Sequence, residues 1–142
     1  MRVSEAILAV VREWIIKADH DLTMAAHILK LGKDAPPEGL GFHAQQCVEK
    51  YLKAILVYRS IPFAKTHVIG DLMNLVPRRY RPTLDVAMQA RLTRYAAVTR
   101  YPVPGPDISL TAARKAVAVA RRVRREVQKK LPKGALPKNK KS

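Results

Sequence analysis

The sequence is poor in cysteine, in aromatic residues and in long apolar runs, and each shortage excludes a class of protein. Its single cysteine, Cys47, cannot form an internal disulfide, and no Cys/His cluster has the spacing of metal ligands. No apolar run approaches the roughly 18 residues that a membrane span requires, and the charged, amphipathic N-terminal region does not resemble a signal peptide. We therefore expect a cytoplasmic protein with no metal, no cofactor and no membrane partner.

The common motifs of nucleotide-binding and metalloprotease sites are also missing. The chain contains no G-x-x-x-x-G-K-S/T loop, no G-x-G-x-x-G loop and no H-E-x-x-H helix. No segment alternates apolar and polar residues with the period of two that is typical of a strand. Apolar residues make up 48% of the chain but aromatic residues only 6%, a balance that suits helix packing. The sequence therefore predicts one all-α domain.

Acidic residues are scarce: 27 Lys and Arg face 11 Asp and Glu, which gives a formal net charge of +16. The final 22 residues carry ten basic side chains and one acid, Glu126, and so hold +9 of that total. Such a balance favours an anionic partner such as nucleic acid or a nucleotide, with binding that weakens in salt. The alternative is a solubilising tail that contacts nothing specific.

Apolar residues that recur at three- and four-residue steps predict the helices. The expected ranges are 4–31, 41–59, 68–75 and 84–98, followed by a last helix that ends near residue 131. The expected N-terminal caps are Ser4, Thr66, Thr83 and one of Asp107, Ser109 or Thr111. The prolines and glycines between residues 33 and 40 predict a loop there. We expect an up-and-down bundle of four main helices plus one short helix over residues 1–131, and a disordered Lys-rich tail over residues 132–142.

The second helix carries polar side chains where an apolar stripe should continue. Gln45, Gln46, Glu49 and Lys53 lie near one face, and buried polar groups are costly unless they are hydrogen-bonded. One interpretation is an exposed edge on which Glu49 pairs with Lys53 one turn away. We predict instead a polar seam, in which Asp21, Gln46 and Glu49 meet partners across the bundle. The candidate partners are Lys65, His67, Arg100 and Tyr101.

Four segments, in this order and spacing, resemble the HEPN domain of prokaryotes. They are Trp14-x-x-x-Ala18-x-x-Asp21-Leu22-x-x-Ala25, the run from Phe42 to Leu56, Lys65-Thr66-His67-x-x-x-Asp71-Leu72, and Arg100-Tyr101-Pro102. The similarity covers about residues 10–125. It implies a helical bundle that forms a homodimer and works with a minimal nucleotidyltransferase as the toxin of a toxin–antitoxin pair.

Many HEPN proteins are metal-independent ribonucleases that use an Arg, four to six residues, then a His. None of the four histidines here follows an arginine at that distance, so the resemblance leaves ribonuclease activity open. If the protein does cleave RNA, the candidate catalytic residues are Arg100, His67 and His43.

Three functional interpretations follow from this resemblance. In the first, a nucleotide or RNA binds to a basic site where Arg100 contacts phosphate and Tyr101 stacks on or positions the ligand. The supporting cations of that site are Lys53, Lys50, His67 and Lys65. The second is a ribonuclease toxin that combines Arg100 with His43 or His67. The third is a structural dimer subunit without a ligand.

Overall fold

The computed structural model describes residues 2–138, and over this range the protein is helical with no strand. The α-helices are α1 (Glu5–Leu29), α2 (Pro37–Tyr58), α3 (Ile69–Leu75), α4 (Val86–Val98) and α5 (Leu110–Lys130). Short 3₁₀ turns are η1 (Gly32–Asp34), η2 (Arg78–Tyr80) and η3 (Lys133–Ala135). The predicted all-α bundle of four main helices and one short helix is confirmed. None of the helices in residues 2–138 is both long and apolar enough to cross a membrane.

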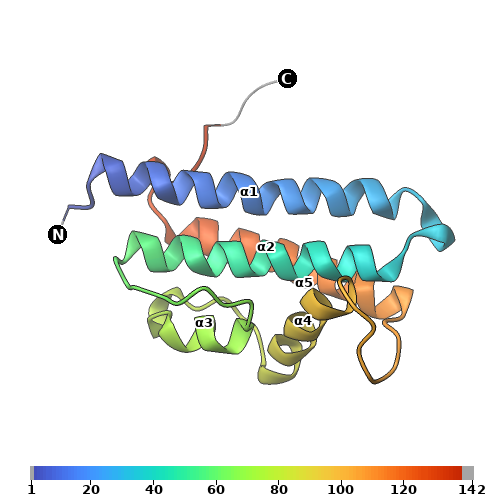
Figure 1. Cartoon of the computed structure of the whole chain (residues 1–142). Helices are drawn as coiled ribbons and strands as arrows, with labels where there is room; N and C mark the ends of the chain where they lie inside the picture. Colours follow the sequence, from blue (N-terminus) through green and yellow to red (C-terminus); the bar gives the residue numbers. More distant parts are fainter. Residues whose placement is uncertain (1, 139–142) are drawn as a thin grey trace.

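Helix α2 lies at the centre of the bundle and contacts each of the other four α-helices. It runs antiparallel to α1, with α5 behind it and with α3 and α4 on the side away from α1 (Figure 1). Its buried residues include Val48, Leu52 and Ile55, which are inaccessible to solvent. Because α2 is enclosed in this way, polar groups on its surface must find partners on neighbouring elements or face the few gaps between them.

The structure corrects the start of α2. The helix begins at Pro37, inside the segment that we predicted to be a loop. Proline is tolerated at the first helical position, where its missing N–H would have no intrahelical partner. Gly41 then permits a close approach, since a Cβ there would lie 2.8 Å from Ile108 Cδ1 and 3.1 Å from Tyr95 Cγ. The glycines that argue against a helix in isolation therefore serve its packing.

The helix caps agree only in part with the sequence. Ser4 caps α1 and Ser109 caps α5, each accepting a hydrogen bond from a backbone N–H of the first turn. Thr83 does not cap α4, because Asp85 occupies that position. The Thr83 hydroxyl instead donates to Glu126 on α5 at 2.7 Å. Thr66 accepts from the Val68 backbone N–H, which places it in the turn before α3 rather than at the cap itself.

The structure also corrects the first part of the expected C-terminal tail. Residues 133–135 form η3, which packs against α1, and Ala135 is fully buried. Arg12 on α1 donates to the Gly134 carbonyl at 2.5 Å, and Leu136 packs on the core. Residues 139–142, where the prediction also placed disorder, lie outside the described residues. The high lysine content of residues 132–142 predicts a solvated segment, but Ala135 and Leu136 pack on the bundle and hold its first part in place.

Candidate functional site

A group of polar side chains on and around α2, which we call the α2 polar cluster, is organised by two buried carboxylates. The first is Asp21 on α1, which is 6% exposed. Its Oδ1 lies 2.8 Å from His43 Nδ1, and its Oδ2 accepts a hydrogen bond from Lys50 Nζ at 2.6 Å. His43 and Lys50 are two helical turns apart and therefore share one face of α2. One acid on α1 thus holds a histidine and a lysine of α2 in place.

The second carboxylate, Glu49, lies on α2 itself and makes a similar pair of contacts. It is 3% exposed, and its Oε2 accepts from Lys53 Nζ at 3.0 Å. Its Oε1 lies 2.8 Å from His67 Nδ1 and accepts from Gln45 Nε2 at 3.0 Å. Each buried acid of the cluster therefore pairs with one lysine and one histidine.

Two glutamines complete the cluster. Gln45 is fully buried, and its amide also donates to the His67 carbonyl at 3.0 Å, which fixes the loop before α3. Gln46 donates to Gln45 Oε1 at 2.6 Å. These contacts explain why amides interrupt the apolar stripe of α2: each is paired inside a network that joins α2 to the loop before α3.

Lys53 and Lys50 differ in how far they reach the surface. The Lys53 side chain is 9% exposed, and its ammonium lies 5.6 Å from the centre of the Trp14 ring and 5.8 Å from that of Phe63. The buried cation is thus stabilised by Glu49 and by two aromatic rings. The Lys50 side chain is 21% exposed and borders solvent. Of the two lysines, only Lys50 is placed to meet a ligand.

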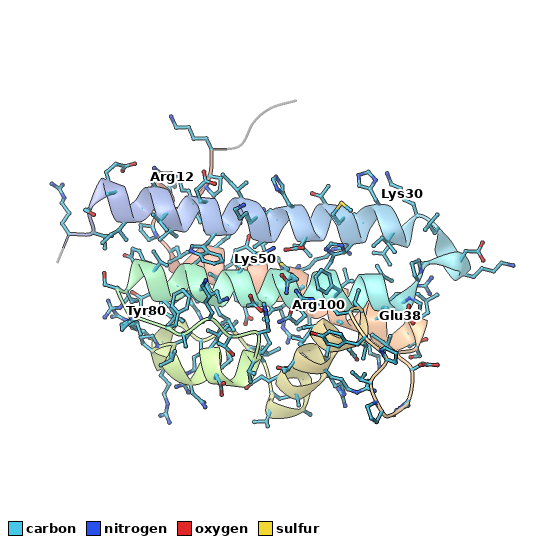
Figure 2. The ribbon with its side chains drawn as sticks, viewed as in Figure 1. Arg12, Lys30, Glu38, Lys50, Tyr80 and Arg100 are labelled. Carbon is cyan, nitrogen blue, oxygen red and sulfur yellow. The ribbon has the colours of Figure 1, made fainter. Side chains whose placement is uncertain are left out.

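Arg100, just after α4, lies beside the Asp21 half of the cluster. Its guanidinium is 5.9 Å from the centre of the Phe42 ring, and Phe42 in turn meets the His43 ring edge-on at 5.4 Å between centroids. Figure 2 labels Arg100 and Lys50. Arg100 is exposed, and its side chain has no carboxylate partner among residues 2–138. Sequence reasoning missed Phe42 as the platform for this arginine, although a ring at the start of the polar face of α2 was the available signal.

Two of the candidate site residues are not brought into the cluster. Tyr101 is 59% exposed and lines a small hollow of about 160 Å³ together with Glu38 and Asp107. Arg94 lines the same hollow and donates to the Pro104 carbonyl at 3.1 Å, but the two acids outnumber this one cation, so the lining does not favour an anion. Lys65 is exposed in the loop two residues before His67, and it makes no ion pair within the described part of the chain. His67 itself is reached by solvent, since 54% of its side chain is exposed.

A second polar group lies where α1, α2 and α5 meet, and the sequence did not reveal it. Tyr51 donates its hydroxyl to Asp19, Arg124 Nε donates to the same carboxylate at 3.0 Å, and Gln128 donates to the Tyr51 oxygen at 3.1 Å. Burial, followed by the hydrogen bond to Asp19, raises the pKa of the Tyr51 phenol above its ordinary value of 10.0. Burial likewise raises the pKa of the Cys47 thiol well above its usual range. The Tyr51 phenol and the Cys47 thiol therefore stay neutral near pH 7. The hydrogen bonds among Tyr51, Asp19, Arg124 and Gln128 join the three helices.

The exposed part of the α2 polar cluster, together with Arg100 beside it, offers a guanidinium without a carboxylate partner in residues 2–138, a lysine, and a histidine whose Nδ1 is held by a carboxylate. Such a set can bind a phosphate or carboxylate group, and a histidine oriented in this way can also transfer a proton. Within residues 2–138, no three His, Cys, Asp or Glu side chains are grouped so as to hold a metal ion.

Comparisons with known proteins agree with this architecture. A crystal structure of the Thermus thermophilus protein TT1696 superposes with a TM-score of 0.68 at 29% identity, over 85% of this chain and 98% of that one. A protein of Methanocaldococcus jannaschii named "Putative toxin MJ1304" is 36% identical over 63 residues, which span 44% of this chain and 40% of that relative. The chain therefore aligns with less than half the length of that protein. The model of the HEPN domain matches residues 11–131, and on this match the chain belongs to the HEPN domain family.

Proposed function

We propose that this protein is a toxin-like HEPN module that binds the phosphate of RNA or of a nucleotide at the exposed part of the α2 polar cluster. The observation that carries the proposal is the exposed guanidinium of Arg100, which lies over the Phe42 ring beside His43 and has no carboxylate partner among residues 2–138. The buried Asp21 fixes both His43 and Lys50 before any ligand arrives. Binding to groups already in place loses less side-chain entropy, which favours affinity.

The proposed site differs from the one expected from the sequence. Arg100, His43 and Lys50 form its centre, and His67 and Lys65 extend it along the loop before α3. Lys53 is buried and does not contact the ligand; it pairs with Glu49, which in turn holds His67. Tyr101 lies outside it.

The toxin-like role and the partners belong to the same proposal. The relative's name supports a toxin, and the HEPN family membership supports a homodimer that acts with a minimal nucleotidyltransferase. Light scattering on the purified protein tests the dimer. Co-expression with a nucleotidyltransferase encoded beside it, followed by capture on a tag, tests the partner; failure to co-purify contradicts that part of the proposal.

A second candidate function, metal-independent RNA cleavage, is favoured by one observation. Asp21 holds His43 by Nδ1, and the other ring nitrogen, Nε2, has no hydrogen-bond partner among residues 2–138. A histidine held this way is suited to general acid–base catalysis, with Arg100 stabilising charge on phosphate. The missing Arg-x(4–6)-His motif argues against it.

Fluorescence anisotropy with a labelled single-stranded RNA, and with AMP as competitor, tests the binding proposal. Arg100→Gln should weaken binding by about tenfold or more, since a hydrogen bond to a charged group contributes roughly 1.5–3 kcal/mol. The matched control is Arg91→Gln, which removes one exposed charge from α4 and should change binding little. Equal effects of the two variants contradict the site.

Incubating the same RNA with the wild-type protein in EDTA separates the two candidate functions. Intact RNA agrees with a binding module. Cleavage that is lost in Arg100→Gln and in His43→Gln favours the ribonuclease instead. If neither RNA nor AMP binds at low salt, the structural dimer subunit becomes the better account.

A further inference from the structure

The outer face of α5 carries a row of cations that the α2 polar cluster does not include. Arg114, Arg121, Arg125 and Lys129 are all exposed, and their spacing of seven, four and four residues places them on one face of the helix. We call this row the α5 basic stripe. From first to last residue it extends about 22 Å, at 1.5 Å per residue.

Three cations next to the stripe, unlike its members, are occupied by structural contacts within residues 2–138. Arg122 donates to the Thr83 carbonyl at 2.8 Å, and Lys130 donates to the Arg81 carbonyl at 2.7 Å. Arg124 is held by Asp19. In residues 2–138 no acidic side chain lies in an ion pair with any member of the stripe. The charge of the stripe is therefore available to a partner.

A shallow groove between α1 and α5 runs beside the stripe. One hollow of about 320 Å³ is lined by Arg121 and Arg124 with Asp19, and a second of about 410 Å³ shares Asp19 and Arg124 and continues to Lys138. Asp19 is the one acid that lines the two hollows, and its carboxylate already accepts hydrogen bonds from Tyr51 and Arg124. The groove thus presents cations along its length.

The lack of exposed large apolar side chains on α5 and on residues 131–138 indicates which class of partner this face would bind. None of the large apolar residues that are exposed lies on α5 or on residues 131–138. Protein interfaces are anchored by buried aromatic or aliphatic side chains, and membrane-surface helices insert Trp, Phe or Leu. A row of three arginines and a lysine without such anchors suits the phosphates of a nucleic-acid strand, which in B-form geometry follow one another about every 3.4 Å.

We propose that the α5 basic stripe and the adjoining groove bind the phosphate backbone of a nucleic-acid strand without reading its sequence. This surface goes beyond the proposed function because it shares no residue with the site around Arg100. It would hold a long strand while the other site takes a single phosphate or end. At about 22 Å, the stripe matches the length of about six phosphates at the B-form spacing of about 3.4 Å.

The test is the salt dependence of binding to a single-stranded RNA of mixed sequence, measured by anisotropy with the full-length protein. Each phosphate contact contributes about 0.7 to the slope of log K against log salt for single strands, so Arg121→Gln/Arg125→Gln should reduce that slope by about 1.4. The control, Lys17→Gln/Lys30→Gln, removes two exposed charges from α1 and its C-cap and should leave the slope nearly unchanged. Circular dichroism checks that both proteins remain folded.

A reduced slope in the α5 variant alone supports the stripe, and equal reductions in both variants overturn it in favour of net charge. No RNA binding by the wild type, or binding only to anionic vesicles, also overturns it. Matched single-stranded DNA and duplex RNA distinguish the source of the phosphates. AMP affinity should depend on Arg100 and not on Arg121 or Arg125, so the two proposals fail separately.

Discussion

Replacing Glu49 by glutamine should destabilise the fold more than any exposed charge change. The variant keeps the shape of the side chain but removes the negative charge that faces the Lys53 ammonium at 3.0 Å. Both side chains are less than 10% exposed, so the lysine would be left as a buried cation without a counter-charge. Removing one partner of a buried pair costs about 3–5 kcal/mol.

The lower end of that range applies here, for two reasons visible in the structure. Lys53 keeps its contacts with the rings of Trp14 and Phe63, each a cation–π interaction of about 0.5–2 kcal/mol. The glutamine amide can still accept hydrogen bonds from the lysine. We therefore expect about 3 kcal/mol, equivalent to a fall in Tm of about 6–12 °C for a domain of this size.

Urea denaturation of a four-protein cycle measures this: the wild type, Glu49→Gln, Lys53→Met and the double variant. The double variant should be more stable than Glu49→Gln, because an apolar side chain replaces the uncompensated cation. Glu13→Gln, an exposed carboxylate of α1, serves as the control and should change stability by less than about 0.5 kcal/mol. A cost below about 1 kcal/mol for Glu49→Gln, or strict additivity of the two single changes, would refute the reasoning.

Three further predictions concern packing and pH. Gly41→Ala should destabilise the fold by about 1–2 kcal/mol in urea denaturation, although alanine favours helices, because the new methyl group meets Ile108 and Tyr95. Equal or greater stability of the variant would contradict this close approach. Ala135→Asp should release the C-terminal segment from α1, seen as faster trypsin cleavage there with the bundle intact, and unchanged cleavage would show that the segment is not fastened by this contact. The raised pKa of Tyr51 stabilises the fold fully below pH 10 and loses that effect as pH rises above 10, where only the unfolded phenol ionises; the wild type should therefore lose up to about 1.4 kcal/mol per pH unit relative to Tyr51→Phe, and parallel curves would contradict the burial beside Asp19.

The sequence predicted the helices well because the apolar periodicity of each one is strong. It failed where local propensity and tertiary packing oppose each other. Pro37 and the glycines after it favour a loop in isolation, yet they form the first turns of α2. Tyr95 of α4 and Ile108 pack so closely on position 41 that only glycine fits there. The lysine-rich segment after α5 favours disorder, but Ala135 and Leu136 find a surface on α1.

The polar groups of the site were identified from the sequence, and so were His67 and Lys53 as candidate partners of Glu49, but the partners of Asp21 were not. An acid on α1 and amides on α2 could be expected to pair, since their burial requires it. Which groups meet depends on how α1 is rotated against α2, and periodicity does not encode that rotation. Asp21 therefore pairs with His43 and Lys50 of α2 rather than with the more distant Lys65 or Arg100. The separation of Tyr101 from Arg100 depends on the turn that follows α4.

An NMR titration of the wild-type protein with AMP tests most directly whether the exposed part of the α2 polar cluster and Arg100 bind phosphate. Signals of the histidine rings and of the arginine side-chain N–H groups report on each candidate residue separately. Saturable shifts are expected at His43 and at Arg100, with smaller ones at His67 and none at His20. AMP that binds while the His43 and Arg100 signals stay unmoved would contradict phosphate binding at this site.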